Sequence, residues 1–513
     1  MISRKRFTVS TALIALVLSG STSDVHAANR GPDFDNDNID DLAIGVPNQQ
    51  VGVESLAGMV NVLYGSASGL TDPSNRITSI DRGVPGVEGA PDGSDFFGRT
   101  VSWGDFNADC FDDLAVTTLL GDLQIFYGSS TGLSLANDDI VVTAMALSNS
   151  SAAGDFNGDG FDDIAVQEGS MSEVWVLYGS SSGITDTAGP GLQIWDLDAL
   201  GVSNPTGLEL FGWSLATGDF NCDGKDDLAV GAPQQNVGAE SGAGQVHIIY
   251  GTSSGLSATG TTAWHQTSPN VEGAAEAGDE FGYALATGNF NNDTSNGRAC
   301  HDLAIGIPFE DAGAVNDGAV AVLFGTPTSG IQASSPADSL WYQERADVEG
   351  NGDSHEFFGK SIAVGNMDAD SFEDLAIGIP GEGIGGAIAI IRGASGGMTD
   401  ADDVLWTQDT NFVADDAEGQ DDFGECVTYG REWYTTLNRG LAVCVPHEDV
   451  LGTTDAGMVN VMYLQDTSTP QLSILGGSWI QSSIDTQTVE ADDVFGSSLT
   501  AARDRPFTSG SCG

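Results

Sequence analysis

The chain has 513 residues, and its 16 Lys and Arg against 74 Asp and Glu give a formal net charge of −58. Such a surface repels phosphate backbones and anionic lipid headgroups, so nucleic-acid and membrane-surface binding are not expected. Acidic chains are often disordered, but here 40% of the residues are hydrophobic and many recur in short runs, which indicates a folded protein.

The first predicted element is an export signal over residues 1–27. A positive region, RKR at 4–6, precedes a short apolar stretch at 11–18, and Val25-His26-Ala27 offers a small-residue cleavage site before Ala28. The apolar stretch is too short to span a bilayer. We therefore expect a secreted or periplasmic protein with no membrane insertion and no lipid anchor.

One phrase recurs through residues 28–513 and predicts a single repeat domain. Its copies begin at Asp33, Gly104, Gly154, Gly218, Gly288 and Gly365, and a degenerate seventh copy begins at Tyr429. The copy from Gly154 reads GDFNGDGFDDIAV, and successive copies start roughly 50 to 77 residues apart. This period is too long for ankyrin or tetratricopeptide units and suits a four-stranded blade.

Strand-like segments flank each phrase. An apolar stretch opened by Phe-Gly comes before it, an alternating strand such as GQVHIIYG follows a Gly-rich turn after it, and a Trp-bearing segment ends most repeats. Four short antiparallel strands per repeat without an amphipathic helix predict an all-β fold, a seven-bladed β-propeller. An array of separate β-sandwiches is the alternative, which the regular spacing disfavours.

The two chain ends predict how the ring closes. The phrase at Asp33 lacks a preceding Phe-Gly strand, whereas an unpaired Phe495-Gly496 stands near the C-terminus. We expect the strand near residues 495–503 to complete blade 1, which would leave no open sheet edge.

The phrases also predict calcium sites. Calcium takes six to eight oxygens, and each loop offers carboxylates or amides at positions 1, 3, 5 and 9 with a backbone carbonyl at position 7. The predicted ligands are Asp33, Asp35, Asp37, Ile39 and Asp41 in loop 1; Asp105, Asn107, Asp109, Phe111 and Asp113 in loop 2; Asp155, Asn157, Asp159, Phe161 and Asp163 in loop 3; Asp219, Asn221, Asp223, Lys225 and Asp227 in loop 4; and Asn366, Asp368, Asp370, Phe372 and Asp374 in loop 6.

These five loops predict about five Ca²⁺ ions, and a sixth is left open. Loop 5 begins with Asn289, Asn291 and Asp293 but carries an insertion before Asp302, while loop 7 has Arg431, Trp433 and Thr435 at ligand positions and should be empty. An EF-hand is excluded because position 12 is not Glu and no helices flank the loops. Turn formation alone would not require oxygen ligands at all four places.

The order of Phe-Gly, loop and Gly-x-Pro resembles the FG-GAP repeats of integrin α subunits. Gly231-Ala232-Pro233 matches literally, and Gly45, Gly306 and Gly378 begin looser matches. The resemblance covers nearly all of residues 31–503, although the second and third repeats lack Gly-x-Pro and the third lacks Phe-Gly.

Six cysteines permit up to three disulfides with fifteen connectivities. From the expected architecture we predict three pairs: Cys426–Cys444, which brackets the metal-free loop 7; Cys222–Cys300, in loops of neighbouring blades; and Cys110–Cys512, across the ring closure.

The resemblance also implies a ligand side on the face opposite the calcium loops. The acidic connections that precede Phe-Gly lie there, and they offer Glu88, Asp92, Glu272, Asp279, Glu349 and Asp353. These connections are equally explained as solvated loops.

Two functions remain open, with binding favoured over catalysis. The first is a monomeric, calcium-binding recognition or adhesion module for an extracellular protein or glycan of unknown identity. The alternative is an extracellular hydrolase or lyase, phospholipase-D-like or polysaccharide-acting, with its site in the propeller channel. The pattern GxSxG occurs three times, from Gly128, Gly179 and Gly251, but each copy follows a strand end and leads into another strand, as blade turns do.

Overall fold

The computed structural model describes residues 29–504 with gaps, so the predicted export signal, Cys512 and the last residues lie outside the described part. The gaps are 68, 71–75, 137, 143–149, 169–171, 204, 328, 335–336, 344, 346–347, 351, 369, 414–416, 432, 434–438, 451, 466, 468–469, 473–476, 481–494, 496 and 500–502. The described residues form no helix, and therefore none that could cross a membrane.

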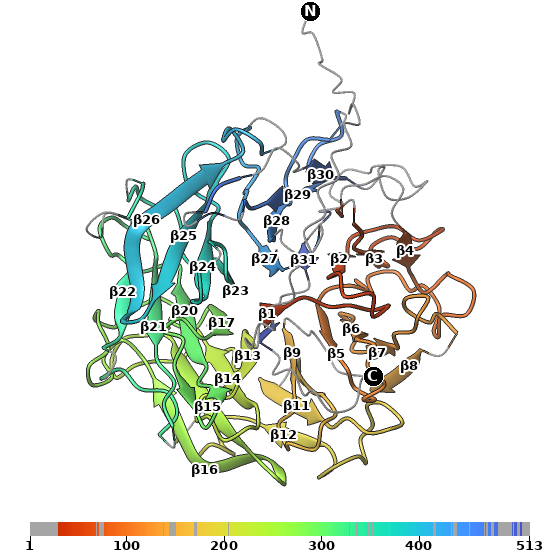
Figure 1. Cartoon of the computed structure of the whole chain (residues 1–513), viewed down its shortest axis with the longest axis horizontal. Coiled ribbons are helices and arrows are strands. Elements are labelled where there is room, and N and C mark those ends of the chain that lie inside the picture. The colour runs from red at the N-terminus through yellow and green to blue at the C-terminus, as the bar shows by residue number, and fades with distance from the viewer. Residues whose placement is uncertain are drawn as a thin grey trace, which may run out of the picture.

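Seven four-stranded antiparallel sheets stand around a central axis, which confirms the predicted propeller (Figure 1). From the axis outward, blade 1 is β31 (Ser498–Leu499), β2 (Leu42–Val46), β3 (Met59–Leu63) and β4 (Ile77–Ile80); blade 2 is β5 (Val101–Gly104), β6 (Asp113–Thr117), β7 (Leu123–Phe126) and β8 (Asp139–Val142); blade 3 is β9 (Ser151–Gly154), β10 (Asp163–Glu168), β11 (Glu173–Leu177) and β12 (Gln193–Trp195); blade 4 is β13 (Leu215–Gly218), β14 (Asp227–Ala232), β15 (Gln245–Thr252) and β16 (Gly255–Trp264).

The remaining blades follow the same order. Blade 5 is β17 (Ala284–Gly288), β20 (Asp302–Ile307), β21 (Ala319–Leu323) and β22 (Ser339–Trp341); blade 6 is β23 (Ser361–Gly365), β24 (Asp374–Ile379), β25 (Ala387–Ala394) and β26 (Gly397–Thr407); blade 7 is β27 (Val427–Gly430), β28 (Gly440–Val445), β29 (Met458–Tyr463) and β30 (Gly477–Trp479). Two small pairs stand apart: β1 (Asn29–Arg30) with β32 (Arg503–Asp504), and β18 (Thr294–Ser295) with β19 (Arg298–Ala299).

The core lies between blades rather than within any one of them. Every residue of the second strands is buried, because neighbouring sheets cover both of their faces. This explains why phrases such as LAIGI read as continuous apolar runs instead of alternating ones. Each hydrophobic cluster joins two adjacent blades; one contains Leu42 and Ile44 of blade 1 together with Trp479 of blade 7.

The C-terminal strand closes the ring as predicted. Ile44 pairs with Leu499 and Gly45 with Ser498, so β31 is the innermost strand of blade 1. Phe495 is fully buried in the cluster between blades 7 and 1. The Ser498 hydroxyl also donates to the carbonyl oxygen of Gly98, the residue after Phe97, at 2.9 Å.

A recurring polar contact joins six of the seven pairs of neighbouring blades on the face that carries the loops between the first and second strands, which we call the loop face. The residue at loop position 8 accepts a hydrogen bond from the backbone amide at position 1 of the preceding loop. Asp162 does so from the Asp105 amide at 2.8 Å, and the Asp162 amide donates to the Asp105 carbonyl oxygen at 3.1 Å. The equivalent acceptors are Asp112, Asp226, His301, Glu373 and Asp40.

Asp40 carries this chain of contacts across the ring closure, because it accepts from the Arg431 amide of blade 7 at 2.8 Å. Between blades 6 and 7 the residue directly before β28 is Arg439, whose guanidinium group carries no acceptor atom. There the Tyr429 hydroxyl donates to the Asn366 carbonyl oxygen at 3.0 Å.

Two of the three predicted disulfides are confirmed. Cys222–Cys300 joins the loops of blades 4 and 5, and Cys426–Cys444 joins the first two strands of blade 7. The second bond lies at the ends of these strands that point away from loop 7, so it clamps the sheet rather than the loop. Cys110 is also disulfide-bonded, and its predicted partner Cys512 lies outside the described residues.

Ring closure depends on Phe495. We predict that Phe495→Ala lowers the free energy of unfolding by about 3–5 kcal/mol, because a buried aromatic ring is lost and a cavity remains. Denaturant unfolding followed by tryptophan fluorescence measures this change. Phe412→Ala is the control, since Phe412 is 52% exposed and should change stability little. Equal stability of the two variants would contradict the role of Phe495.

Asp162→Ala is predicted to lower the free energy of unfolding by about 1–3 kcal/mol, because it leaves the Asp105 amide without its acceptor at a buried junction. Asp162→Asn keeps an acceptor oxygen and should lose less than half as much. The same unfolding experiment compares them, with the exposed Asp186→Ala as control. A charge-based role would instead make the Asn and Ala variants equally unstable.

Candidate metal-binding loops and the opposite face

Backbone amides hold the loop carboxylates in place, as loop 3 illustrates. The Asp155 carboxylate accepts from the amides of Gly158, Asp159 and Gly160 at 2.7–3.1 Å. Gly158 and Gly160 have φ of 73° and 91°, a left-handed conformation that turns these amides inward. The Asp159 carboxylate accepts from the Phe161 amide at 3.1 Å. Loop 2 repeats this pattern, so the sequence folds both loops around their oxygens.

The carboxylate at position 9 is the buried anchor of loops 1 to 6. One oxygen of Asp113 accepts from the Phe106 amide at 3.0 Å and the other from the Gly128 amide at 2.9 Å. Burial raises the pKa of Asp113 to about 9. Five equivalent residues make the same two contacts, and burial raises the pKa of each well above its ordinary value: Asp41, Asp163, Asp227, Asp302 and Asp374.

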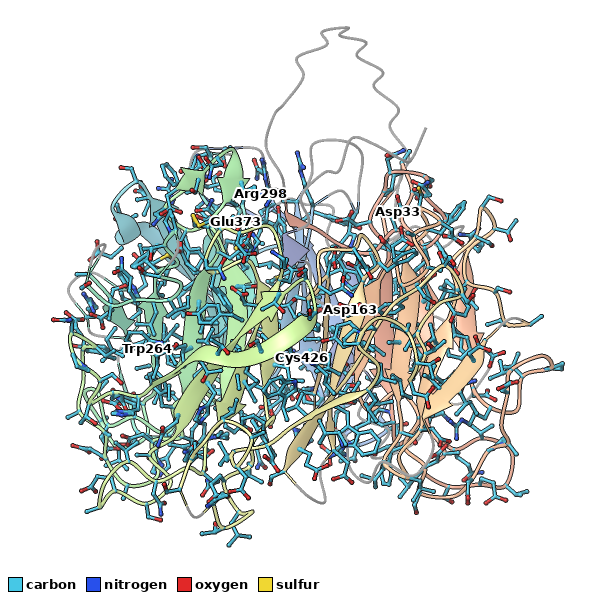
Figure 2. All side chains as sticks on the ribbon, turned by 90° about the horizontal axis from the view of Figure 1, so that it is seen from below. Asp33, Asp163, Trp264, Arg298, Glu373 and Cys426 are labelled. Carbon is cyan, nitrogen blue, oxygen red and sulfur yellow. A yellow bond between two sulfur atoms is a disulfide. The ribbon has the colours of Figure 1, made fainter. Side chains whose placement is uncertain are left out.

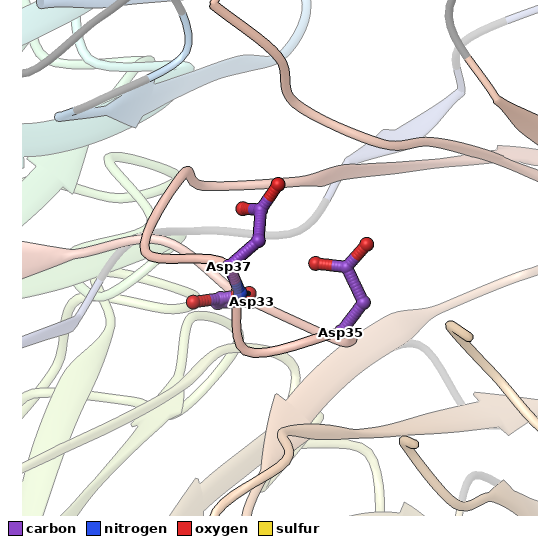
Figure 3. Close-up of side chains that lie close together, drawn as sticks. All are labelled: Asp33, Asp35 and Asp37. Carbon is purple, nitrogen blue, oxygen red and sulfur yellow. Dashed lines mark hydrogen bonds between the residues drawn. The ribbon is translucent and has the colours of Figure 1, made fainter. Parts of the chain in front are cut away.

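Loop 1 brings three carboxylates together, of which Asp33 is buried and Asp37 is exposed. Ligand oxygens of Asp33, Asp35 and Asp37 all lie within 4.8 Å of one another (Figure 3). Loops 2 to 5 have Asn at position 3, so they present an amide oxygen where loop 1 presents a second carboxylate. Asp33, Glu373 and Arg298 lie near one face of the molecule in Figure 2. The first three predicted carboxylates of loop 1 are thus brought together on this loop face.

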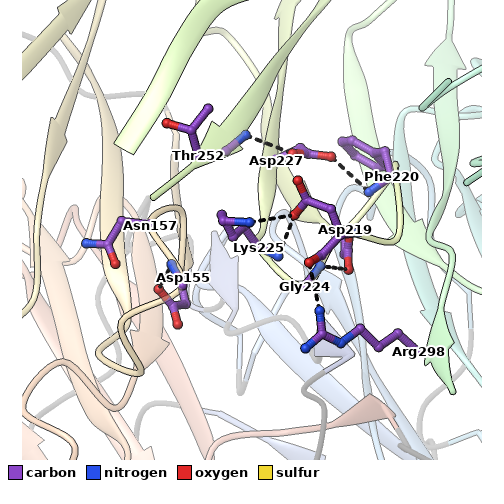
Figure 4. Close-up of polar contacts among 12 residues, drawn as sticks. Asp155, Asn157, Asp219, Phe220, Gly224, Lys225, Asp227, Thr252 and Arg298 are labelled. Carbon is purple, nitrogen blue, oxygen red and sulfur yellow. Dashed lines mark hydrogen bonds and ion pairs between the residues drawn. The ribbon is translucent and has the colours of Figure 1, made fainter. Parts of the chain in front are cut away.

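Basic side chains enter three of the loops, which the sequence interpretation missed. Arg76 contacts Asp35 in loop 1, and Arg392 contacts Asp368 in loop 6. In loop 4, Lys225 lies 3.1 Å from Asp223, and Arg298 donates to the Asp223 carbonyl oxygen at 2.7 Å (Figure 4). Arg76, Arg298 and Arg392 lie outside the phrases they contact, so spacing within a phrase could not reveal them.

Loop 5 keeps its anchor despite the insertion. The extra residues form the separate hairpin β18–β19, and Asp302 still accepts from the Phe290 and Gly325 amides, as position 9 does elsewhere. In loop 7 the buried Trp433 packs against Gly430 and Gly440 and fills the space of the missing ligands. Thr435 lies outside the described residues.

The opposite face, which we call the far face, carries the acidic connections, and three of their glutamates also contact the next blade. Glu88, Glu272 and Glu349 each brace the outer strand of the next blade: the Glu272 amide donates to Asp338 at 2.5 Å and its carboxylate accepts from the Leu340 amide at 3.1 Å. The expectation of a surface ligand group is wrong for Asp279, which is buried because its carboxylate caps the turn at Glu276. Asp92 and Asp353 are exposed.

A row of half-buried aromatic rings crosses blades 4 to 6 on the far face. Centroid distances are 5.5 Å from Trp213 to Tyr283, 6.0 Å from Tyr283 to Phe309 and 5.4 Å from Phe309 to Phe357. The Lys360 ammonium lies 4.6 Å from the Tyr283 ring centre. We call these four rings and Lys360 the aromatic row. Because the rings come from three repeats and from different strands of blade 5, no spacing along the sequence indicates the row.

The central channel holds a cavity of about 210 Å³ lined by the innermost strands of all seven blades. Its described lining is apolar or hydroxylic, and Tyr429 is the one ionisable side chain there. No acid and base converge among these residues, so the described channel offers no support for the hydrolase or lyase alternative. The three GxSxG segments are hairpin turns; in each, the residue after the first Gly caps the last Gly carbonyl oxygen, as Ser180 does at 2.8 Å.

Comparison with known proteins agrees with this architecture. The FG-GAP repeat model matches residues 148–177 and 211–249. Human phosphatidylinositol-glycan-specific phospholipase D is 33% identical over 170 residues, which are 33% of this chain and 18% of that protein. Integrin alpha-5 of Xenopus laevis is 31% identical over 192 residues, which are 37% of this chain and 16% of that protein. Integrin alpha-PS2 of Drosophila melanogaster is 31% identical over 176 residues, which are 33% of this chain and 11% of that protein.

The matched stretches therefore cover less than a fifth of the length of each of these relatives. The repeat match, the loops and the seven closed sheets agree on one architecture. The chain is a seven-bladed β-propeller that contains FG-GAP repeats at residues 148–177 and 211–249 and is similar in sequence to integrin α chains.

Proposed function

We propose that this chain is a secreted, calcium-loaded propeller that recognises an extracellular protein or glycan as a monomer and serves in adhesion. The observation that carries recognition is the aromatic row, because half-buried rings beside a cation are typical of binding surfaces. The channel beneath it has no acid–base pair in its described lining. Similarity to integrin α chains supports the same role.

Secretion is supported by two features. Disulfides persist in oxidising compartments and are rare in the cytosol, and this chain has Cys222–Cys300 and Cys426–Cys444. The positive and apolar segments of residues 1–27 fit an export signal. Cleavage before Ala28 would leave β1 close to the new N-terminus.

Calcium loading is supported by loops that assemble hard oxygen ligands in register. A cation would relieve the repulsion among carboxylates that crowd within each loop. Loops 2 and 3 are the strongest candidates, since none of the basic contacts found in loops 1, 4 and 6 enters them. For loops 4 and 6 we propose that calcium displaces Lys225 and Arg392 from the carboxylates.

Calcium is predicted to raise the melting temperature, because ligand binding to the folded state stabilises it by about 2.7 kcal/mol for each site at a hundredfold excess over Kd. Differential scanning calorimetry in calcium and in EDTA measures the shift. Asp159→Ala should remove one bound ion and part of the shift, because Asp159 is an exposed loop ligand without a core contact. Asp198 is also exposed, and Asp198→Ala should change neither the number of bound ions nor the shift in melting temperature. A melting temperature that EDTA leaves unchanged would contradict calcium loading.

Recognition through the aromatic row predicts that a glycan and extracellular-protein array will yield a ligand whose affinity falls about thirtyfold in Phe309→Ala and in Lys360→Ala, the loss of about 2 kcal/mol typical of a hot spot. Surface plasmon resonance of the array hit measures the affinities. Phe412→Ala removes an exposed ring elsewhere and should bind normally. If both row variants bind like the parent, the ligand lies on another surface.

A further inference from the structure

Three consecutive blade junctions on the far face repeat one group of three side chains. A glutamine stands two residues after the outer-strand Trp, an acidic residue stands two residues before Phe-Gly, and a glutamate comes from the loop between the second and third strands of the next blade. The groups, called junction groups below, are Gln266, Asp279 and Glu310; Gln343, Glu356 and Glu382; and Gln408, Asp421 and Glu448.

In each group the glutamine and the glutamate are in direct contact. The glutamine amide nitrogen donates to the glutamate carboxylate at 2.6 Å for Gln266–Glu310, 2.7 Å for Gln343–Glu382 and 3.0 Å for Gln408–Glu448. Each of the three glutamines is only 1% exposed. In the middle group the carboxyl groups of Glu356 and Glu382 are themselves in contact.

Each group contains a buried acceptor with no donor. The side-chain carbonyl oxygens of Gln266, Gln343 and Gln408 have no hydrogen-bond partner, nor does Oε2 of Glu356. Turning the amide around would place its oxygen against the glutamate carboxylate, so the orientation is settled by chemistry. Buried acceptors that face carboxylates require a donor or a cation.

The junction between blades 1 and 2 supplies that cation from the chain itself. Arg82 takes the glutamine position, two residues after Ile80, which pairs with β3 as the Trp residues pair in other blades. Its guanidinium lies 2.9 Å from Asp95, two residues before Phe97, and 2.7 Å from Asp122 in the β6–β7 loop. The junction has the same two carboxylates, and here they are neutralised.

A neighbouring glycine verifies that Arg82 and the glutamines occupy equivalent places. A Cβ on Gly89 would lie 3.2 Å from the Arg82 side chain, one on Gly273 would lie 3.0 Å from Gln266, and one on Gly350 would lie against Gln343. All three glycines follow Val-Glu in the same connection. The glutamine side chains therefore occupy the place that the Arg82 side chain occupies at its own junction.

The junction between blades 3 and 4 has neither the glutamine nor the second carboxylate. Leu197 stands at the glutamine position and Gln235 at the glutamate position, so only the carboxylate of Glu209 remains. Gln235 bonds instead to His247 at 2.8 Å. At this junction the loss of the glutamine therefore coincides with the loss of the second carboxylate.

We propose that each junction group binds one hard divalent cation, such as Ca²⁺, through its two carboxylates and the glutamine carbonyl oxygen, with water completing the coordination. An all-oxygen donor set selects this class of ion. Burial raises the pKa of Asp279 to about 6, of Glu310 to about 7 and of Glu356 to about 8, so the bare carboxylates are unfavourable there.

The ions would also steady the aromatic row. Phe309 and Phe357 are the chain neighbours of Glu310 and Glu356, so cations held by the junction groups would position these two rings. The sites are distinct from the calcium loops, which lie at the other ends of the strands.

Equilibrium dialysis of the EDTA-stripped full chain against Ca²⁺, and separately against Mg²⁺, tests the proposal by counting bound ions. Glu356→Gln combined with Glu382→Gln should bind one ion fewer than the parent. Gln343→Arg should also bind one ion fewer, because it installs the internal cation seen at Arg82. In EDTA this variant should unfold at or above the melting temperature of the parent, which shows that the lost ion does not result from a folding defect.

The matched control is Asp186→Asn with Asp198→Asn, which removes the same charge from exposed sites and should leave the ion count unchanged. An unchanged count in both junction variants for both metals would overturn the proposal and mean that a proton or water neutralises the pair. Asp159→Ala reports on the calcium loops in the same assay, so failure of the loops and failure of the junction sites are distinguishable.

Discussion

The two adjacent residues at loop positions 8 and 9, both acidic in most loops, hold the loops and the neighbouring blades together. At position 9 a buried carboxylate joins the start of its own loop to the end of the third strand, as Asp113 does with the Phe106 and Gly128 amides. At position 8 the neighbouring side chain reaches the previous blade, as Asp162 does. One dipeptide thus shapes a loop and fastens the ring, and six blades use one residue or both in this way.

Blade 7 lacks these carboxylates and relies on other interactions. Trp433 fills its loop, Cys426–Cys444 clamps its strands, and Tyr429 replaces the missing contact to blade 6. This blade meets the C-terminal strand at the closure, where Phe495 and Trp479 share one cluster. Hydrophobic packing and a covalent bond therefore stand where the other blades use oxygen-rich loops.

Both faces of the propeller carry more carboxylates than basic side chains can neutralise. Carboxylates gather on the loop face around backbone amides and on the far face around the glutamines, while the few basic residues sit beside particular carboxylates, as Arg82 and Arg392 do. A chain with 74 acidic and 16 basic residues cannot neutralise its carboxylates internally. Both the loop sites and the junction groups would draw the balance from divalent ions in the surroundings.

The sequence by itself determined the blade count, the strand order, the closure by the C-terminal strand and two disulfide pairs, because these follow from repeat period and from residues that recur in register. It also placed the loop oxygens, since ligand spacing is local. Only the tertiary structure revealed the position 8 contacts, the basic residues in loops 1 and 6, the aromatic row and the junction groups. Each of these joins residues from different repeats, or from distant strands of one blade, and their proximity depends on how strands and sheets pack around the axis rather than on any spacing along the chain.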